Sequence, residues 1–245
     1  MKDGRVIIVM GGSFNPPTQA HYLLMEEAVD ALDADMGHFV PVSDAYLRRK
    51  MRNCHPPVVL SPELRVRMLQ VMCEDDSRLK VCKKEIGTVE PRTLLTLHEL
   101  RHDYPDADLY FVMGADKVGL LTNLANNREF LDNFKVVLFS RESTTLEESV
   151  RDNQVLSAYQ DRIVILSQPE GTEGISSSLV RMRMMDGQSC QDLLCPGVWQ
   201  LFNAFTPSDF PDVICRFKGE YEFLSNLNYS LFTFHLSSCL IKSSP

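Results

Sequence analysis

Residues 5–21 read RVIIVMGGSFNPPTQAH and join an apolar run to a pair of glycines and then to the start of a helical pattern. A short uninterrupted apolar run is typical of a strand that is buried on both faces of a parallel sheet. Similar β-rich runs recur along the chain, so we expect strands at residues 5–10, 38–42, 79–82, 109–113, 136–139 and 163–166.

Segments with helical periodicity separate these runs. We expect helices at residues 21–32, 62–72, 93–101, 128–133, 146–158, 177–185 and 196–202. Ser61 before Pro62 makes a good helix start, and Thr145 with Glu148 forms a capping-box pattern. Regular alternation of strands and helices predicts an α/β fold, a Rossmann-like doubly wound parallel sheet with a C-terminal helical subdomain.

The 245 residues predict one large domain over residues 1–205. Residues 206–211 have the composition of a linker. The remaining residues, 212–245, form a tail too short to fold alone.

Composition narrows the functional classes. With 44% hydrophobic and 24% charged residues the chain reads as a soluble globular protein, and no apolar run reaches the roughly 20 residues of a membrane helix. Without a secretion signal, a cytoplasmic or nuclear location is expected. The net charge of −8 argues against long nucleic acid as a partner. The seven cysteines are scattered without zinc-site or disulfide-framework spacing.

Ligands of such sheets bind beyond the carboxyl ends of the strands, where the first strand is followed by GGSFNPPTQAH. Glycines there allow close approach of a ligand, and Thr18 and His21, three positions apart at a helix start, face the same way. A helix N-terminus of this kind binds phosphate. The alternative interpretation is a tight turn with a capping threonine and a surface histidine.

A second candidate phosphate site reads GISSSLVR over residues 174–181. Its serines either cap a helix or yield the free N–H groups to an anion, and Arg181 lies within one turn of Ser177 and Ser178. A guanidinium fork suits phosphoryl oxygens. The alternative is a capped helix that carries a solvated arginine.

Together, GSFNPPTQAH (residues 12–21) and ISSSLVR (residues 175–181) resemble the paired ATP-binding motifs of the nicotinamide mononucleotide adenylyltransferases, members of the (H/T)-x-x-H nucleotidyltransferase superfamily. PVSDAY at residues 41–46, followed by Lys50, extends the resemblance, which covers about residues 5–204. It implies that the domain over residues 1–205 is a nucleotidyltransferase domain. The implied reaction moves AMP from ATP to nicotinamide or nicotinate mononucleotide and releases pyrophosphate.

The resemblance also implies residue roles. His21 and Arg181 would be the catalytic residues, and Lys50 and Thr93 would bind the acceptor. The ATP-binding residues would be Gly12, Ser13, Phe14, Thr18, His21, Gly114, Asp116, Ser177, Ser178 and Arg181. No protein residue is expected to bind a metal, because Mg²⁺ would be held mainly by the substrate phosphates.

Two features depart from the family pattern. Members of the family stack the pyridine on aromatic rings, whereas Glu90 and Ala125 occupy those positions here. Base–aromatic stacking contributes roughly 1–3 kcal/mol, so its loss would weaken or redirect acceptor binding. In the tail, ICRFKGEYEFLSN (residues 214–226) resembles the opening of a NADAR domain, but residues 231–245 do not continue it.

Alternative functions share parts of this pattern. An adenylyltransferase for another phosphomonoester, such as phosphopantetheine, would have the same two motifs. A non-catalytic nucleotide sensor or chaperone would also keep the pocket. An aminoacyl-tRNA synthetase core needs a KMSKS loop, which RKMR at residues 49–52 does not match. The preference for amide or acid mononucleotide and the formation of a homo-oligomer stay open.

Overall fold

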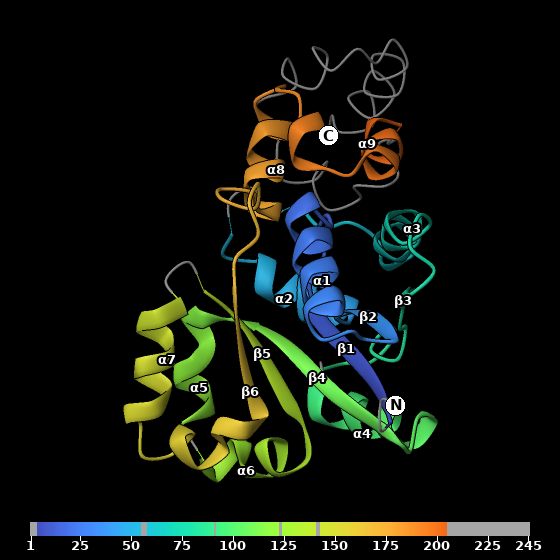
Figure 1. The fold of residues 1–245 in the computed structure, drawn as a ribbon. Helices are drawn as coiled ribbons and strands as arrows, with labels where there is room; N and C mark the ends of the chain where they lie inside the picture. Colours follow the sequence, from blue (N-terminus) through green and yellow to red (C-terminus); the bar gives the residue numbers. More distant parts are fainter. Residues whose placement is uncertain (1–3, 55–57, 91, 123, 141–142, 205–245) are drawn as a thin grey trace, which may run out of the picture.

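The computed structural model describes residues 4–204, apart from residues 55–57, 91, 123 and 141–142. Its centre is a six-stranded, entirely parallel sheet with the order β3-β2-β1-β4-β5-β6 (Figure 1). The strands are β1 (Arg5–Gly12), β2 (Met36–Pro41), β3 (Leu79–Val81), β4 (Ala107–Gly114), β5 (Lys135–Ser140) and β6 (Ile163–Ser167). All six predicted strands are confirmed within two residues at each end.

The helices of the described residues are α1 (Gln19–Ala31), α2 (Asp44–Met51), α3 (Pro62–Met72), α4 (Thr93–Asp103), α5 (Val118–Leu121), α6 (Leu124–Asn133), α7 (Ser143–Asp152), α8 (Ser177–Met185) and α9 (Pro196–Asn203). Short 3₁₀ turns occupy Ala115–Lys117, Leu156–Arg162 and Gln191–Leu193. Helices α3 and α8 begin and end at the predicted residues.

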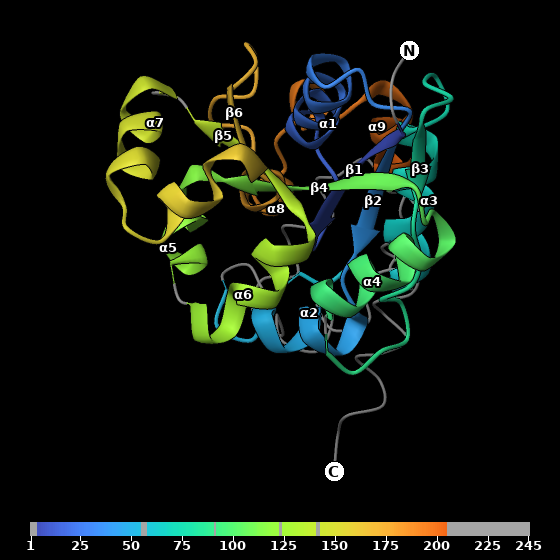
Figure 2. The same cartoon turned by 60° about the horizontal axis from the view of Figure 1, so that its bottom comes forward.

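Alternate residues of the strands feed two separate cores, one on each face of the sheet. Ile8 of β1 packs into a cluster with residues of α1, α3, α8 and α9, whereas Ile7 and Val9 pack with α4, α5, α6 and α7. Figure 2 shows α4 and α6 on the face opposite α1. Since successive side chains of a strand point to opposite faces, this sorting confirms the predicted doubly wound α/β architecture. The C-terminal helices α8 and α9 complete the core on the α1 side.

The sequence misplaced one helix and missed two others. Helix α7 begins at Ser143, so Thr145 lies inside it and the predicted capping box with Glu148 is wrong. The predicted continuation of this helix to residue 158 is also wrong, because the α-helix ends at Asp152 and a 3₁₀ turn follows. Helices α2 and α5 were not predicted.

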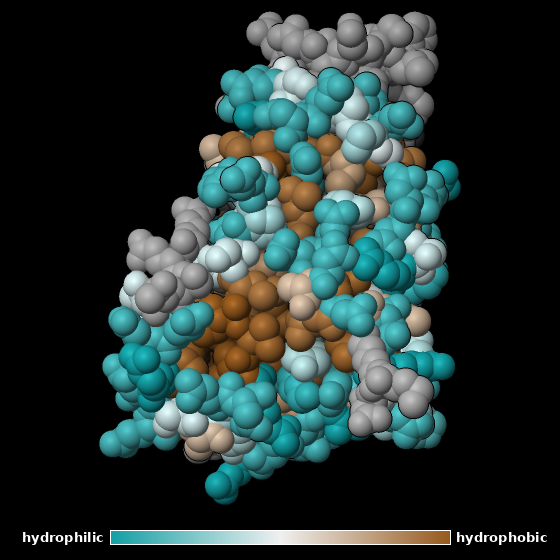
Figure 3. Space-filling view, viewed as in Figure 1, coloured by the Kyte–Doolittle hydropathy of each residue, from teal (hydrophilic) through white to brown (hydrophobic). Residues whose placement is uncertain are grey.

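On the face viewed in Figure 1, α1 lies over β1 and β2, while the described chain leaves β5 and β6 in view. Figure 3 shows an apolar area on this part of the surface. None of the described helices is both long and apolar enough to cross a membrane. The predicted linker, the tail and its NADAR-like segment lie outside the described residues.

The strand order places β1 and β4 next to each other, with the sequence running outward from this pair in both directions. Ligands of open α/β sheets bind at this switch point, beyond the carboxyl ends of the strands. Gly12 ends β1 and Gly114 ends β4, so the predicted motif residues start at that point.

Candidate active site

Two adjoining cavities lie beyond the carboxyl ends of the central strands and share the wall residues Ser13, His21, Leu24 and Lys50. The smaller, of about 380 Å³, is lined by three serines of the second motif and is called the serine cavity here. The larger, of about 520 Å³, includes the rings of Tyr46, Phe111 and Phe139 and is called the aromatic cavity.

The structure brings most of the predicted site residues to these cavities. The serine cavity is lined by Ser13, Phe14, Thr18, His21, Lys50, Ser177, Ser178 and Arg181, and the aromatic cavity adds Gly12, Thr93 and Gly114. Asp116 lines neither cavity; its carboxylate is largely exposed and pairs with Lys117 over 2.7 Å.

The turn after β1 is shaped by Gly12 and Phe14. A Cβ on Gly12 would lie 2.9 Å from the ring of Phe14, so a larger residue would displace that ring. Phe14 itself has a φ of +43° and is buried, with its ring edge-to-face against the imidazole of His21 at 5.1 Å. The glycine therefore allows Phe14 to fold back under the turn and support His21.

Thr18 contacts His21 and orients its ring. The backbone N–H of Thr18 donates to Nδ1 of His21 over 3.0 Å, and the Thr18 hydroxyl lies 2.7 Å from the same atom. An imidazole that accepts at Nδ1 carries its proton on Nε2. Burial lowers the pKa of His21 to about 4, so the ring is neutral near pH 7 and presents one N–H donor. Within the described part of the chain, nothing pairs with Nε2.

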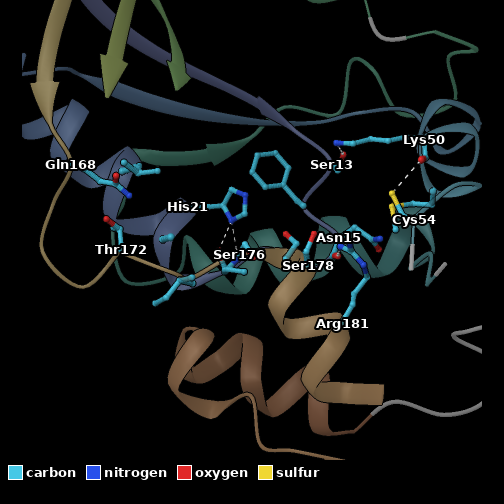
Figure 4. Close-up of a pocket in the computed structure, with 17 residues that line it drawn as sticks. Ser13, Asn15, His21, Lys50, Cys54, Gln168, Thr172, Ser176, Ser178 and Arg181 are labelled. Atoms are coloured by element: carbon cyan, nitrogen blue, oxygen red, sulfur yellow. Dashed lines mark hydrogen bonds between the residues drawn. The ribbon is translucent and has the colours of Figure 1, made fainter. Parts of the chain in front are cut away.

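The second motif reaches the first through side chains at the start of α8. The hydroxyl of Ser177 donates to the carbonyl of Pro16 over 2.7 Å, and Nη1 of Arg181 donates to the carbonyl of Asn15 over 2.8 Å. Ser176, not its successors, is the N-cap and accepts from the N–H of Leu179. Figure 4 shows Ser13 and Lys50 on one side of the serine cavity and Ser176, Ser178 and Arg181 on another.

Arg181 is only 6% exposed, which excludes the interpretation as a solvated helix residue. Its Nη2 donates to the hydroxyl of Ser178 over 3.0 Å, and burial lowers the pKa of its guanidinium. No carboxylate pairs with it among the described residues. Arg181 thus holds the two motifs together and places a buried positive charge, with donors to spare, at the cavity wall.

Lys50 lies where the two cavities meet. Its ammonium donates to the hydroxyl of Ser13 over 3.0 Å, with no carboxylate partner in the chain as described. The residue comes from α2, which begins after Ser43, whose hydroxyl accepts from the N–H of Tyr46. An acidic first turn and basic last turn suit the dipole of this helix.

At the end of β4, Gly114 makes room for the carboxylate of Asp116, which a Cβ at position 114 would strike. Thr93 is the first residue of α4 and lines the aromatic cavity together with the buried Glu85. Glu85 accepts from the hydroxyl of Thr96, and burial raises its pKa.

Glu90 does not line the aromatic cavity but forms a bidentate pair with Arg49 at 2.5 and 2.6 Å. The side chain of Ala125 lies outside the described residues. Aromatic rings in this cavity come instead from Tyr46, Phe111 and Phe139. Among the residues that the structure describes, no three His, Cys, Asp or Glu side chains are grouped so as to hold a metal ion.

Sequence reasoning missed the role of Asn15. This buried side chain donates to the carbonyl of Val58 over 2.7 Å and accepts from the N–H of Leu60 over 2.9 Å. Its own carbonyl receives Arg181. Asn15 therefore links three segments, and its position within the first motif was the available signal.

Residues 9–183 match the family model described as cytidylyltransferase-like. The chain is 30% identical over 191 residues to a probable nicotinate-nucleotide adenylyltransferase of Bacillus mycoides, covering 78% of this chain and 91% of that protein. It is also 30% identical over 185 residues to the protein of that name from Carboxydothermus hydrogenoformans, covering 75% and 88%.

Among solved structures, the fold is similar to that of Plasmodium falciparum nicotinic acid mononucleotide adenylyltransferase complexed with NaAD. The TM-score is 0.61 at 17% identity, over 84% of this chain and 98% of that one. The chain belongs to the cytidylyltransferase-like family and is an enzyme of the nucleotidyltransferase class.

Proposed function

We propose that the protein transfers the adenylyl group of ATP to a pyridine mononucleotide, nicotinate or nicotinamide, and so forms the dinucleotide and pyrophosphate. The two bacterial relatives described above are named probable nicotinate-nucleotide adenylyltransferase, and the chain covers 91% and 88% of their lengths. This support applies to the reaction class and to the pyridine acceptor. The amide and the acid form of the mononucleotide both belong in the acceptor assay.

The observation that carries the proposal is the convergence of His21, Lys50 and Arg181 on one cavity. Each presents N–H donors, and none of them pairs with a carboxylate among the described residues. Uncompensated donors of this kind stabilise the negative charge of a polyphosphate in a partly dehydrated site. The hydroxyls of Ser13, Ser176 and Ser178 in the same wall accept hydrogen bonds from the protein, so each keeps its own proton for a phosphoryl oxygen.

The proposed chemistry is an in-line displacement. A phosphate oxygen of the acceptor attacks the α-phosphorus of ATP, the bond from that phosphorus to the β-phosphate oxygen breaks, and pyrophosphate leaves. Such a step needs positioning and charge stabilisation rather than a protein nucleophile. Nε2–H of His21 would donate to the transferring phosphate, and Arg181 would stabilise the leaving phosphates from α8.

Mg²⁺ is proposed to enter with the triphosphate. The cavity wall offers cations and hydroxyls rather than clustered carboxylates, a donor set that fits phosphate oxygens. Bound there, the ion would neutralise part of the charge of the departing pyrophosphate.

The acceptor is proposed to occupy the aromatic cavity, with its phosphate at Lys50. This ammonium lies at the junction of the cavities, 3.0 Å from the hydroxyl of Ser13, and thus close to the donors that would hold ATP. The rings of Tyr46, Phe111 and Phe139 offer apolar surface for a flat heterocycle. Gly114 at the end of β4 and Asp116 at the rim are proposed to contact the ribose of ATP.

The test is a panel assay with ATP, Mg²⁺ and one phosphomonoester at a time: nicotinate mononucleotide, nicotinamide mononucleotide and phosphopantetheine. Products are identified by mass. We expect a pyridine dinucleotide from at least one mononucleotide and a strongly reduced yield with Lys50→Met. Exclusive turnover of phosphopantetheine would contradict the proposed acceptor, and the absence of any adenylylated product would favour the non-catalytic sensor.

A further inference from the structure

Arg65 of α3 is a large charged side chain with 0% exposure, and the reaction proposed above assigns it no part. Its Nη1 donates to the carbonyl of Ser13 over 3.0 Å, and its Nη2 donates to the carbonyl of Val42 over 2.9 Å. Its Nε has no partner in the described chain. The guanidinium fork therefore joins two backbone segments that lie far from α3 in sequence.

Both carbonyls belong to turns that carry candidate site residues. Ser13 follows the end of β1, and Val42 follows the end of β2 and leads into α2. The N–H of Val42 also donates to the carbonyl of Gly12 over 2.9 Å, so the two turns are adjacent. Arg65 spans this pair of turns and lines neither of the two cavities.

The fork bears directly on the contact between Ser13 and Lys50. Helix α2 starts immediately after the Val42 turn and carries Lys50, whose ammonium donates to the Ser13 hydroxyl. One end of Arg65 thus holds the residue that accepts from Lys50, and the other end holds the turn from which the helix of Lys50 starts. A shift at either carbonyl would change the place where the two cavities meet.

Burying a cation is costly, but an apolar side chain at this position would leave the carbonyls of Ser13 and Val42 without their donors. Burial lowers the pKa of Arg65 to about 10, and the weaker attraction of Asp44 and Glu63 acts in the opposite direction. The guanidinium therefore stays charged near pH 7. Two carbonyls on separate turns require two donors at a fixed separation, which only the planar fork provides.

We propose that Arg65 is a positioning residue: it fixes the positions of Ser13 and Lys50 relative to each other at the junction of the two cavities. The inference depends on the proposed function only in that ATP and a pyridine mononucleotide are taken as the substrates. ATP affinity is an independent readout, since it is measured without an acceptor.

The first variant is Arg65→Lys, which keeps the charge but cannot bridge both carbonyls. We expect it to melt several degrees below the wild type yet remain folded at the assay temperature. Misplacement of a catalytic group by about 1 Å can cost roughly 10²-fold in rate, so we expect kcat/KM for the acceptor to fall by about 10- to 100-fold. ATP affinity, measured by calorimetry, should fall several-fold. Arg67→Met, an exposed arginine of the same helix, is the matched control and should leave the kinetic constants unchanged.

The distinguishing measurement is a double-mutant cycle between Arg65→Lys and Lys50→Met. If Arg65 acts through the placement of Lys50, the loss caused by Lys50→Met should be much smaller in the Arg65→Lys background. Three results would each overturn the inference. The losses in the cycle could be additive, the kinetic constants and ATP affinity of Arg65→Lys could stay within twofold of the wild type, or the Arg65→Lys protein could fail to fold. If the wild type binds ATP but makes no dinucleotide, the proposed function is refuted. The effect of Arg65→Lys on ATP affinity would then decide the role of Arg65.

Discussion

The role proposed for His21 depends on both the orientation and the protonation of its ring. Thr18 occupies Nδ1, and burial keeps the ring neutral, so Nε2–H is the remaining donor. Oxyanion-type donors contribute ~10²–10³-fold to kcat, and we expect His21→Ala to lower kcat by that amount with a small change in melting temperature. The control is His102→Ala, whose side chain is 92% exposed. A folded His21→Ala enzyme with near-normal turnover would remove His21 from the mechanism.

Arg181 should report on activity and stability at once, because it is buried and bonded to both motifs. Arg181 makes one hydrogen bond to Asn15 and one to Ser178, and Arg181→Lys can keep at most one of the two. Hydrogen bonds from charged groups contribute about 1.5–3 kcal/mol each, so we expect a loss of roughly 2 kcal/mol in the free energy of unfolding. We also expect a raised KM for ATP.

Steady-state kinetics beside urea unfolding measures both quantities. If stability falls while the KM for ATP and kcat stay unchanged, Arg181 only joins the two motifs and does not touch the triphosphate.

His38 of β2 predicts a pH dependence of stability that is separate from catalysis. The side chain is 7% exposed, both ring nitrogens lack hydrogen-bond partners among the described residues, and burial lowers the pKa to about 4. The unfolded chain takes up the proton near pH 6.5, so stability is lost as the pH falls from 6.5 to 4. The full effect is on the order of 3 kcal/mol.

His38→Phe should fit beside Tyr104, whose ring centroid lies 6.0 Å away, and remove this contribution. Urea unfolding at pH 7 and pH 4.5 measures it, with His102→Phe as the exposed control. Equal acid destabilisation of both variants and the wild type would show that His38 does not titrate on unfolding.

Residues near a helix start could be placed from the sequence, whereas those that join distant segments could not. Thr18 is the N-cap of α1 and His21 is the third residue of that helix, so their contact is a local capping contact. Asn15 and Arg65 act through partners 23 to 52 positions away, and no local pattern encodes such contacts. The burial of Arg181 was missed for the same reason, since Asn15 lies 166 positions before it.

At the scale of elements, α3 provides a test of helix capping without direct involvement in substrate binding. The hydroxyl of Ser61 accepts from the N–H of Leu64 over 3.2 Å, at the helix start that the sequence predicted. Ser61→Ala should lower the free energy of unfolding by about 1 kcal/mol, measured by urea denaturation, because an N-cap is lost. Kinetic constants should stay within twofold. A larger kinetic change would mean that the start of α3 is coupled to the site through Arg65.

Elements with an apolar run or a long periodic pattern were predicted well, and short amphipathic helices were not. Helix α2 buries only Leu47 and Met51, and four of its eight residues are charged, so it carries little hydrophobic signal. The Ser43 cap and the basic last turn are too weak to predict this helix without a hydrophobic pattern. Helix α7 starts at Ser143, two residues before the predicted cap. Thr145 and Glu148 match the capping-box pattern, but both lie inside the helix.

For the whole molecule, the sequence predicted alternating strands and helices but not the order of the strands. The order β3-β2-β1-β4-β5-β6 depends on the direction in which each crossover turns, which local sequence does not specify. The ends of β1 and β4 could nevertheless be identified as ligand sites, because glycine-containing motifs follow both strands.

The division at residue 205 is a prediction about the whole chain. We expect a protein shortened to residues 1–205 to keep the melting temperature and the kinetic constants of the full chain, because the described residues 4–204 already supply two packed cores and the lining of both cavities. Calorimetric melting and the panel assay on both proteins measure this. A fall of many degrees would mean that the tail packs on the body, for which the apolar area in Figure 3 offers a surface.

The central claim is that AMP passes from ATP to a pyridine mononucleotide at the junction of the two cavities. The most direct measurement follows ATP labelled at the α-phosphorus in the presence of Mg²⁺ and nicotinate or nicotinamide mononucleotide. We predict that the label appears in the dinucleotide in equal amount to the pyrophosphate released, and that His21→Ala abolishes most of both. Label that stays in ATP, or that is released as free AMP while the mononucleotide is unchanged, would contradict the proposed function.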